Sequence, residues 1–163
     1  MPFGFRGPRS GRSTLLTGTA GLVLVAGLST GLAAPAAAAA PPAAVVDTTA
    51  ALPAAAQHLG VPYRLGGTTP AGFDCSGFTG FVFRQLGVHL PRTAHQQMLA
   101  TRPVAAHDAR PGDLVFFLSR GGRAHHVGIY SGDGKMFDSP RAGRTVSERR
   151  IWASTVVFHR VGG

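Results

Sequence analysis

The stretch GFDCSGFTGFVFRQLG, Gly72 to Gly87, places the only cysteine of the chain at the start of a predicted helix. Asp74 is a typical N-cap residue, and Gly87 follows the last turn, where helices favour glycine. The apolar residues recur at helical spacing, at Phe78, Phe81, Val82 and Leu86. At a helix N-terminus the free amide hydrogens and the helix dipole favour an anion, so this position favours the thiolate of Cys75.

Two glycines inside this helix, Gly77 and Gly80, each cost about 1 kcal/mol of helix propensity relative to alanine. Helix propensity therefore does not explain them, and we expect close packing against another element at both positions.

The first 39 residues are expected to be a secretory signal peptide. A basic start with three arginines precedes the apolar run Leu15 to Leu32, and A-x-A cleavage sequences follow at Ala36 to Ala40. Glycines dilute the run and no positive stop follows it, which disfavours a membrane anchor. No cysteine lies near the cleavage region, which disfavours lipid attachment. Residues 40–49 are expected to be a flexible lead-in, and residues 50–163 a single domain.

The net charge of +9 falls to +6 without the three leader arginines. In a secreted protein, extracellular or associated with the cell wall, excess positive charge favours contact with anionic wall polymers. Outside the leader, the arginines are scattered apart from a group near the C-terminus, and no aromatic residues alternate with that group. Nucleic-acid binding is therefore disfavoured.

The lone Cys75 is unusual for an exported domain, because such domains pair their cysteines in disulfides. An unpaired cysteine indicates a reactive thiol or an intermolecular bond, and the alternative is an inert, buried apolar side chain.

The order of elements predicts an α+β fold. A first helix is expected over Thr49 to Leu59, and the Gly/Pro-rich segment VPYRLGGTTPAGF is expected to be an irregular loop leading to the cysteine. Beyond Pro111 the apolar residues recur at every second position in five short runs, as expected of strands. These runs are DLVFFLS, HVGIYSG, KMFDSP, RTVSERR and STVVFHRV. These runs predict an antiparallel sheet on which the helices pack.

His126 is the best candidate for a base among seven histidines. In the predicted strand His126, Gly128 and Tyr130 share one face, while His125, Val127 and Ile129 share the face that looks like core. His126 then points away from this core, beside Gly128, which leaves room for a substrate or a second backbone. The alternative is a solvated histidine at a strand edge.

The hairpin SGDGK decides whether Asp138 can reach His126. A three-residue loop with Gly134 in the left-handed conformation pairs Ser131 with Lys135 and Gly128 with Asp138, which makes Asp138 a diagonal neighbour of His126. A two-residue Asp-Gly loop places them on opposite faces. The sequence allows both loops, and a solvated Asp138 is the alternative to an orienting role.

The segments VPYRLGGTTPAGFDCSGFTGFVFRQLGVHLPRTAHQQ, ARPGDLVFF and HHVGIYSGDGKMFDSP resemble the successive motifs of the NlpC-type peptidases, papain-like cysteine endopeptidases of peptidoglycan. The resemblance runs from about Ala54 to Val161. It implies a papain-like α+β core with Cys75 as nucleophile, His126 as base and Asp138 as the orienting residue. The most familiar members carry histidine at the last position, and a carboxylate performs the same orienting task.

The resemblance also suggests substrate-binding residues. Tyr63 corresponds to a tyrosine that lines the family's active site, where its hydroxyl faces the oxyanion or the substrate. Asp74 and Ser76 flank the nucleophile and are expected to contact substrate amine or peptide groups, with helix capping as the alternative. Arg92 is a candidate for a substrate carboxylate, with an ion pair inside the protein as the alternative.

The function that follows is a secreted endopeptidase of peptidoglycan stem peptides, acting on the bond from D-glutamate to diaminopimelate or lysine. It is expected to be a monomer and to need no metal or cofactor. Two alternatives stay open: a wall amidase or acyltransferase on the same Cys/His layout, and a wall-binding module without catalysis.

Overall fold

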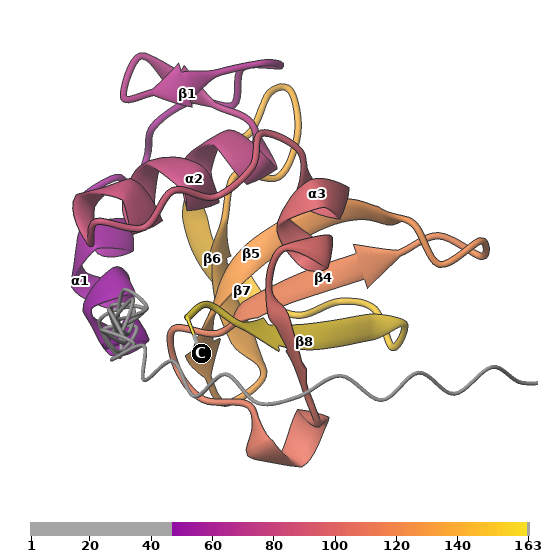
Figure 1. The fold of residues 1–163 in the computed structure, drawn as a ribbon. Coiled ribbons are helices and arrows are strands. Elements are labelled where there is room, and N and C mark those ends of the chain that lie inside the picture. Colours follow the sequence, from indigo (N-terminus) through magenta and orange to yellow (C-terminus); the bar gives the residue numbers. More distant parts are fainter. Residues whose placement is uncertain (1–46, 163) are drawn as a thin grey trace, which may run out of the picture. The chain divides into compact units, whose positions relative to one another are not determined.

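The structure, a computed structural model, describes residues 47–162, and Figure 1 shows its elements in order. The predicted signal peptide and most of the lead-in lie outside these residues. The helices are η1 (Thr48–Ala50), α1 (Ala51–Ala56), α2 (Cys75–Gln85), α3 (Ala94–Leu99) and η2 (Ala106–Asp108). The strands are β1 (Thr68–Thr69), β2 (Gly72–Phe73), β3 (Arg102–Val104), β4 (Leu114–Leu118), β5 (Ala124–Gly132), β6 (Lys135–Asp138), β7 (Ser147–Arg150) and β8 (Val156–Arg160).

The folded domain begins before the predicted boundary at residue 50. The Asp47 side chain accepts a hydrogen bond from the Thr49 amide at 3.0 Å and caps η1. Thr48 is buried, and its carbonyl lies so close to Gly112 that a side chain there would clash with it. The last three residues of the predicted lead-in therefore belong to the domain.

Helix α2 forms where the sequence predicts it. Oδ1 of Asp74 accepts a hydrogen bond from the Gly77 amide at 2.7 Å, and Gly87 takes the left-handed conformation just after the helix, with φ of 78°. The first helix is shorter than predicted, because α1 ends at Ala56 and a series of turns leads to Gly60.

Helix α3 has no counterpart in the prediction, although its start carries a capping box. The Thr93 hydroxyl accepts from the Gln96 amide, and the Gln96 side chain accepts from the Thr93 amide. Gln97 is fully buried and donates to the carbonyls of Ser76 and Pro91, both at 2.9 Å. Helix α3 is thereby tied to the first turn of α2.

The sheet is antiparallel with the strand order β3-β8-β4-β5-β6-β7, which confirms the α+β fold. All five predicted strands are present. Two short additions were not predicted: edge strand β3, and the β1–β2 ladder inside the segment that the sequence indicates as an irregular loop.

Both faces of this sheet are covered. On one face, the residues of β4, β5 and β6 at Leu114, Phe116, Val127, Ile129 and Phe137 pack with buried residues of α1 and α2. Alternate residues of the same strands, Val115, Phe117 and Met136, form a second cluster with partly buried residues of the chain from Ile151 to Phe158. The nearly continuous apolar run of β4 follows from burial on both faces.

The two helix glycines differ in their surroundings, so the packing expectation is confirmed for Gly77 and wrong for Gly80. A Cβ on Gly77 would lie 2.0 Å from the Gly67 carbonyl oxygen, whereas a Cβ on Gly80 would have only the Gln97 amide nitrogen, at 3.7 Å. The backbone before Cys75 therefore passes directly over the start of α2.

Gly77→Ala is expected to lower the free energy of unfolding by about 3 kcal/mol, because the Gly67 backbone must move. Gly80→Ala is the matched control and is expected to raise it by up to about 1 kcal/mol through helix propensity. Urea denaturation measures both. Equal effects of the two substitutions would contradict this reading of the packing.

Within residues 47–162, none of the helices combines the length and the apolar character needed to cross a lipid bilayer.

Candidate active site

Cys75 is the first residue of α2, and the backbone that leads to it is fixed by hydrogen bonds. The Asp74 amide donates to the Gly67 carbonyl at 3.0 Å, and the buried Ser139 hydroxyl, just after β6, donates to the Phe73 carbonyl at 2.8 Å. The Cys75 side chain is partly exposed and is not in a disulfide. The thiol therefore lies on a rigid support at a helix N-terminus, as the sequence predicts.

His126 lies on β5 and faces the second apolar cluster, away from the helix-covered core, as predicted. Its ring packs edge-on against Phe117, with ring centroids 5.3 Å apart, and lies beside Trp152 at 5.4 Å. His125 does not share the core face as predicted, because the ladder to β4 shifts register there. Phe117 pairs with His126 and Leu118 with Ala124, so Ala124 is buried in the core and His125 is exposed.

The β5–β6 hairpin reaches the required register by a route that the sequence analysis did not consider. Its loop has two residues, Asp133 and Gly134, both with positive φ, and Gly132 pairs with Lys135. A register shift between Tyr130 and Gly132 adds one residue to β5. The shift cancels the change of face that a two-residue loop would impose.

Beyond this bulge, Ile129 pairs with Phe137, which puts Gly128 opposite Asp138 as in the predicted register. A Cβ on Gly128 would lie 2.9 Å from the Phe137 carbonyl oxygen, so a second backbone, not a substrate, occupies the space beside Gly128. His126 and Asp138 are diagonal neighbours, and Nε2 of His126 lies 2.7 Å from Oδ2 of Asp138.

The structure thus brings Cys75, His126 and Asp138 together in one chain of contacts. Nε2 of the imidazole is bonded to the fully buried Asp138. The Cys75 side chain lies close enough to His126 to raise the pKa of the imidazole. Because Nε2 is occupied, Nδ1 is the ring nitrogen left to face the thiol.

Arg149, on β7, is a neighbour of Asp138 that the sequence analysis missed. Its guanidinium donates twice to the carboxylate, from Nε to Oδ1 at 2.8 Å and from Nη2 to Oδ2 at 2.7 Å. It also stacks over Trp152, 4.0 Å from the ring centroid. The charge of Arg149 compensates a buried carboxylate. A histidine at position 138 would leave this arginine without its counter-charge, which gives a physical reason for aspartate here.

These contacts set the charges of His126 and Asp138. Burial lowers the pKa of His126, but the hydrogen bonds to Asp138 and Cys75, together with their negative charges, outweigh it and raise the pKa to about 9. Burial raises the pKa of Asp138, and the bonds from Arg149 and His126 outweigh it, so the pKa is lowered. At neutral pH the structure therefore favours imidazolium beside a carboxylate.

The raised pKa of His126 predicts a pH dependence of stability. Between an unfolded pKa of 6.5 and a folded pKa of about 9, the folded state binds the extra proton. The stabilisation is complete below pH 6.5 and is lost as the pH rises through 9, a decrease of at most about 3 kcal/mol in the free energy of unfolding. Urea denaturation at a series of pH values measures it. His126→Gln is expected to remove this slope, and parallel curves for the two proteins would contradict the assignment.

Tyr63 lies near Cys75, on the segment that joins α1 to β1. Burial raises the pKa of its phenol, and the negative charges of Cys75 and Asp74 raise it further. Its amide donates to the Arg144 carbonyl at 2.8 Å, which ties this segment to the β6–β7 connection. The predicted contact of its hydroxyl with substrate stays a prediction.

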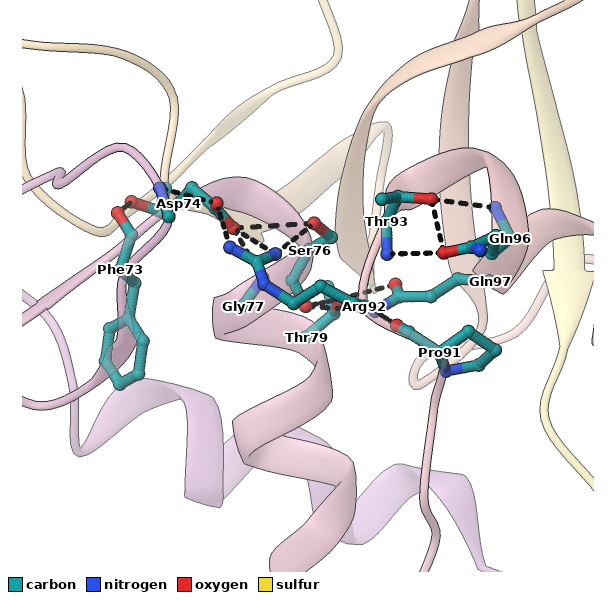
Figure 2. Close-up of polar contacts among 12 residues, drawn as sticks. Phe73, Asp74, Ser76, Gly77, Thr79, Pro91, Arg92, Thr93, Gln96 and Gln97 are labelled. Carbon is teal, nitrogen blue, oxygen red and sulfur yellow. Dashed lines mark hydrogen bonds and ion pairs between the residues drawn. The ribbon is translucent and has the colours of Figure 1, made fainter.

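Asp74 and Ser76, which flank Cys75 in sequence, form a polar network with Arg92, as Figure 2 shows. Nη1 of Arg92 donates to Asp74 Oδ1 and to Ser76 Oγ, both at 3.0 Å, and Nη2 is bonded to Asp74 Oδ2. Asp74 also accepts from the amides of Gly66 and Gly77. The structure thus bears out the alternatives named for Asp74 and Arg92, helix capping and an internal ion pair. The substrate-binding roles of all three residues stay predictions.

Among residues 47–162, no group of three or more histidine, cysteine or acidic side chains is arranged to hold a metal ion.

Comparison with known proteins identifies the family. The NlpC/P60 family model matches residues 60–161. The chain belongs to the NlpC/P60 family. The resemblance seen in its motifs is thereby confirmed, and so is the fold.

Relatives of this NlpC/P60 chain carry names of peptidases. It is 52% identical over 85 residues to the probable endopeptidase p60 of Listeria seeligeri, covering 52% of this chain and 16% of that protein. It is 44% identical over 90 residues to a gamma-D-glutamyl-L-lysine dipeptidyl-peptidase of Bacillus subtilis, covering 54% and 30%. The murein DD-endopeptidase MepH of Escherichia coli is 39% identical over 111 residues, covering 65% and 41%. The chain thus spans less than half the length of these relatives.

Solved structures of peptidoglycan hydrolases share this fold. The NlpC/p60 domain of the peptidoglycan hydrolase SagA superposes with a TM-score of 0.63 at 34% identity, covering 70% of this chain and 97% of that one. The peptidoglycan hydrolase RipB of Mycobacterium tuberculosis has a TM-score of 0.62 at 30% identity, covering 69% and 63%.

Proposed function

We propose that this protein is a secreted cysteine endopeptidase that cleaves peptidoglycan stem peptides. The observation that carries the proposal is the contact chain from Cys75 through His126 to the buried Asp138, at the start of a helix in an NlpC/P60 domain. A nucleophile, a base and an orienting carboxylate in contact are the parts that acyl transfer requires.

In the first half of the reaction, the Cys75 sulfur attacks the carbonyl carbon of the scissile amide as a thiolate, while the proton of the thiol is held on His126 as imidazolium. The negative oxygen of the tetrahedral intermediate is stabilised by the Cys75 amide, which as the first residue of α2 has no partner inside the helix. Tyr63 is the second donor in this scheme. Asp138 stabilises the imidazolium and fixes its orientation.

In the second half, the imidazolium returns the proton to the leaving amine, the C–N bond breaks and a thioester forms between Cys75 and the acyl fragment. His126 then takes a proton from water, the hydroxide attacks the thioester, and the thiol and a new carboxylate are released. No electron transfer is involved.

The bond we propose joins the γ-carboxyl of D-glutamate, or of D-isoglutamine, to diaminopimelate or lysine. The Bacillus subtilis relative is named for a γ-D-glutamyl-L-lysine bond, whereas the Escherichia coli relative is named a DD-endopeptidase. Peptidoglycan would be the main partner of a monomeric enzyme, and the basic surface would add affinity for anionic wall polymers.

Mass spectrometry of digested, purified peptidoglycan tests the function. We expect fragments with a new amino terminus at diaminopimelate or lysine, and stubs that end in D-glutamate. Release of whole stem peptides from the sugar would instead show an amidase, and cleavage limited to cross-bridges a DD-endopeptidase. Undigested peptidoglycan that retains the bound protein would favour the wall-binding module.

A further inference from the structure

A cleft of about 600 Å³ is lined in part by Arg149 and Trp152, which contact Asp138 and His126. Its walls are the β6–β7 connection, strand β7 and the start of the segment after β7. The residues that matter here are Pro140, Thr145, Trp152 and three arginines, Arg141, Arg144 and Arg149. None of its lining residues is acidic, so the cleft is strongly positive.

Two of these arginines are available for a ligand. Arg141 and Arg144 are exposed, and within residues 47–162 neither side chain is in an ion pair. By contrast, Arg92 and Arg160 each form an ion pair with a buried carboxylate, Arg92 with Asp74 and Arg160 with Asp113. The charges of Arg141 and Arg144 therefore have no partner supplied by the described part of the chain.

The loop that carries these two arginines is held by backbone contacts. The Arg144 amide donates to the Arg141 carbonyl at 3.1 Å, and the Arg144 carbonyl accepts from Tyr63. Thr145 forms a bridge with Pro62, and the carbonyl of the next residue, Val146, accepts from the Gly60 amide at 2.9 Å. Because the backbone is fixed, a ligand would not have to order the loop on binding.

Two residues connect the cleft with the site. Arg149 lines it and bonds to Asp138, and Trp152 lines it with its ring 5.4 Å from that of His126. Half of the Trp152 surface is exposed, at 53%. A group bound in the cleft would therefore lie against Arg149 and Trp152, close to the imidazole. We expect this group to belong to the same substrate molecule as the bond that is cut.

We propose that this cleft binds a carboxylate of the stem peptide next to the scissile bond, with Arg141 and Arg144 as its ligands. This inference rests on the proposed function. A guanidinium matches a carboxylate with two parallel hydrogen bonds. D-glutamate keeps its α-carboxylate next to the proposed bond, and diaminopimelate carries a second carboxylate at the far end of its side chain. D-isoglutamine and lysine lack these groups, so the cleft would select the acidic form of the stem peptide.

The test measures binding without cleavage. In the full chain carrying Cys75→Ala, isothermal calorimetry compares a soluble stem peptide containing D-glutamate and diaminopimelate with the same peptide containing D-isoglutamine and lysine. Arg141→Gln with Arg144→Gln is expected to raise Kd for the acidic peptide roughly fivefold and to leave Kd for the neutral peptide unchanged. The matched control is Arg102→Gln, an exposed arginine on β3 at the opposite edge of the sheet, and it is expected to change neither.

Three outcomes would overturn the proposal: an unchanged Kd for the acidic peptide, an equal loss for both peptides, or an equal loss in Arg102→Gln. Weaker retention on phosphate-bearing wall polymer with unchanged peptide binding would assign the cleft to the polymer instead. Failure of the proposed function is separate, since it would appear as no cleavage by the protein with Cys75 intact, whatever the binding data show.

Discussion

Replacing Cys75 with alanine is expected to lower cleavage of stem peptides by about 10⁴-fold or more, because no other group can form the thioester. The fold should be unchanged, since the side chain is only partly buried and α2 is capped by Asp74. Release of new amino termini from peptidoglycan measures the activity, and circular dichroism checks the fold. Cleavage within tenfold of the unaltered protein would remove the proposed mechanism.

A second measurement tests the same thiol without a substrate. Because His126 accepts the proton of Cys75, we expect iodoacetamide to alkylate Cys75 at pH 6 to 7 much faster than a free cysteine. In His126→Ala the alkylation rate should fall to that of an ordinary thiol, and cleavage should be lost as well. Equal alkylation rates in the two proteins would show that the imidazole does not activate the sulfur.

Asp138→Asn is expected to lower kcat by about 10² to 10⁴-fold, with a smaller change in KM. The amide keeps the size of the side chain but removes the charge that stabilises the imidazolium and accepts from Arg149. The pKa of His126 should fall from about 9, and NMR titration of the imidazole measures this fall independently of activity.

Arg149→Gln separates the two partners of the carboxylate. It leaves the 2.7 Å contact between Asp138 and His126 in place, so the loss in kcat should be smaller than in Asp138→Asn. Loss of the arginine's charge should raise the pKa of Asp138 toward its ordinary value.

An Asp138→Asn enzyme with nearly full activity would show that the imidazole is oriented by other contacts.

The start of α2 and the five predicted strands could be read from sequence because they depend on local signals. Asp74, Gly87 and the spacing of Phe78 and Val82 define the helix, and alternation defines the strands. The choice of Cys75 and His126 needed only their positions in these elements. The family motifs then narrowed the choice among seven histidines.

Most of the features that could not be predicted from the sequence depend on how the strands pair and on where the chain runs after them. Arg149 meets Asp138 because Ser147 pairs with Asp138 across β6 and β7, and nothing in SERR sets that pairing. Trp152 reaches His126 after the chain leaves β7. The exposed position of His125 follows from a local shift that alternation cannot show. Helix α3 was missed although its capping box is visible at Thr93 and Gln96, because the segment is short.

The extra residue in β5 near Ser131 has an evolutionary consequence. Surface hairpins commonly gain or lose single residues without harm, since their tips touch little else. Here, loss of one codon at the bulge would turn the carboxylate at 138 to the opposite side of the sheet while leaving every other side chain unchanged. The hairpin tip can therefore change in sequence during evolution, but an insertion or deletion of a single residue between His126 and Asp138 would move the carboxylate away from the imidazole.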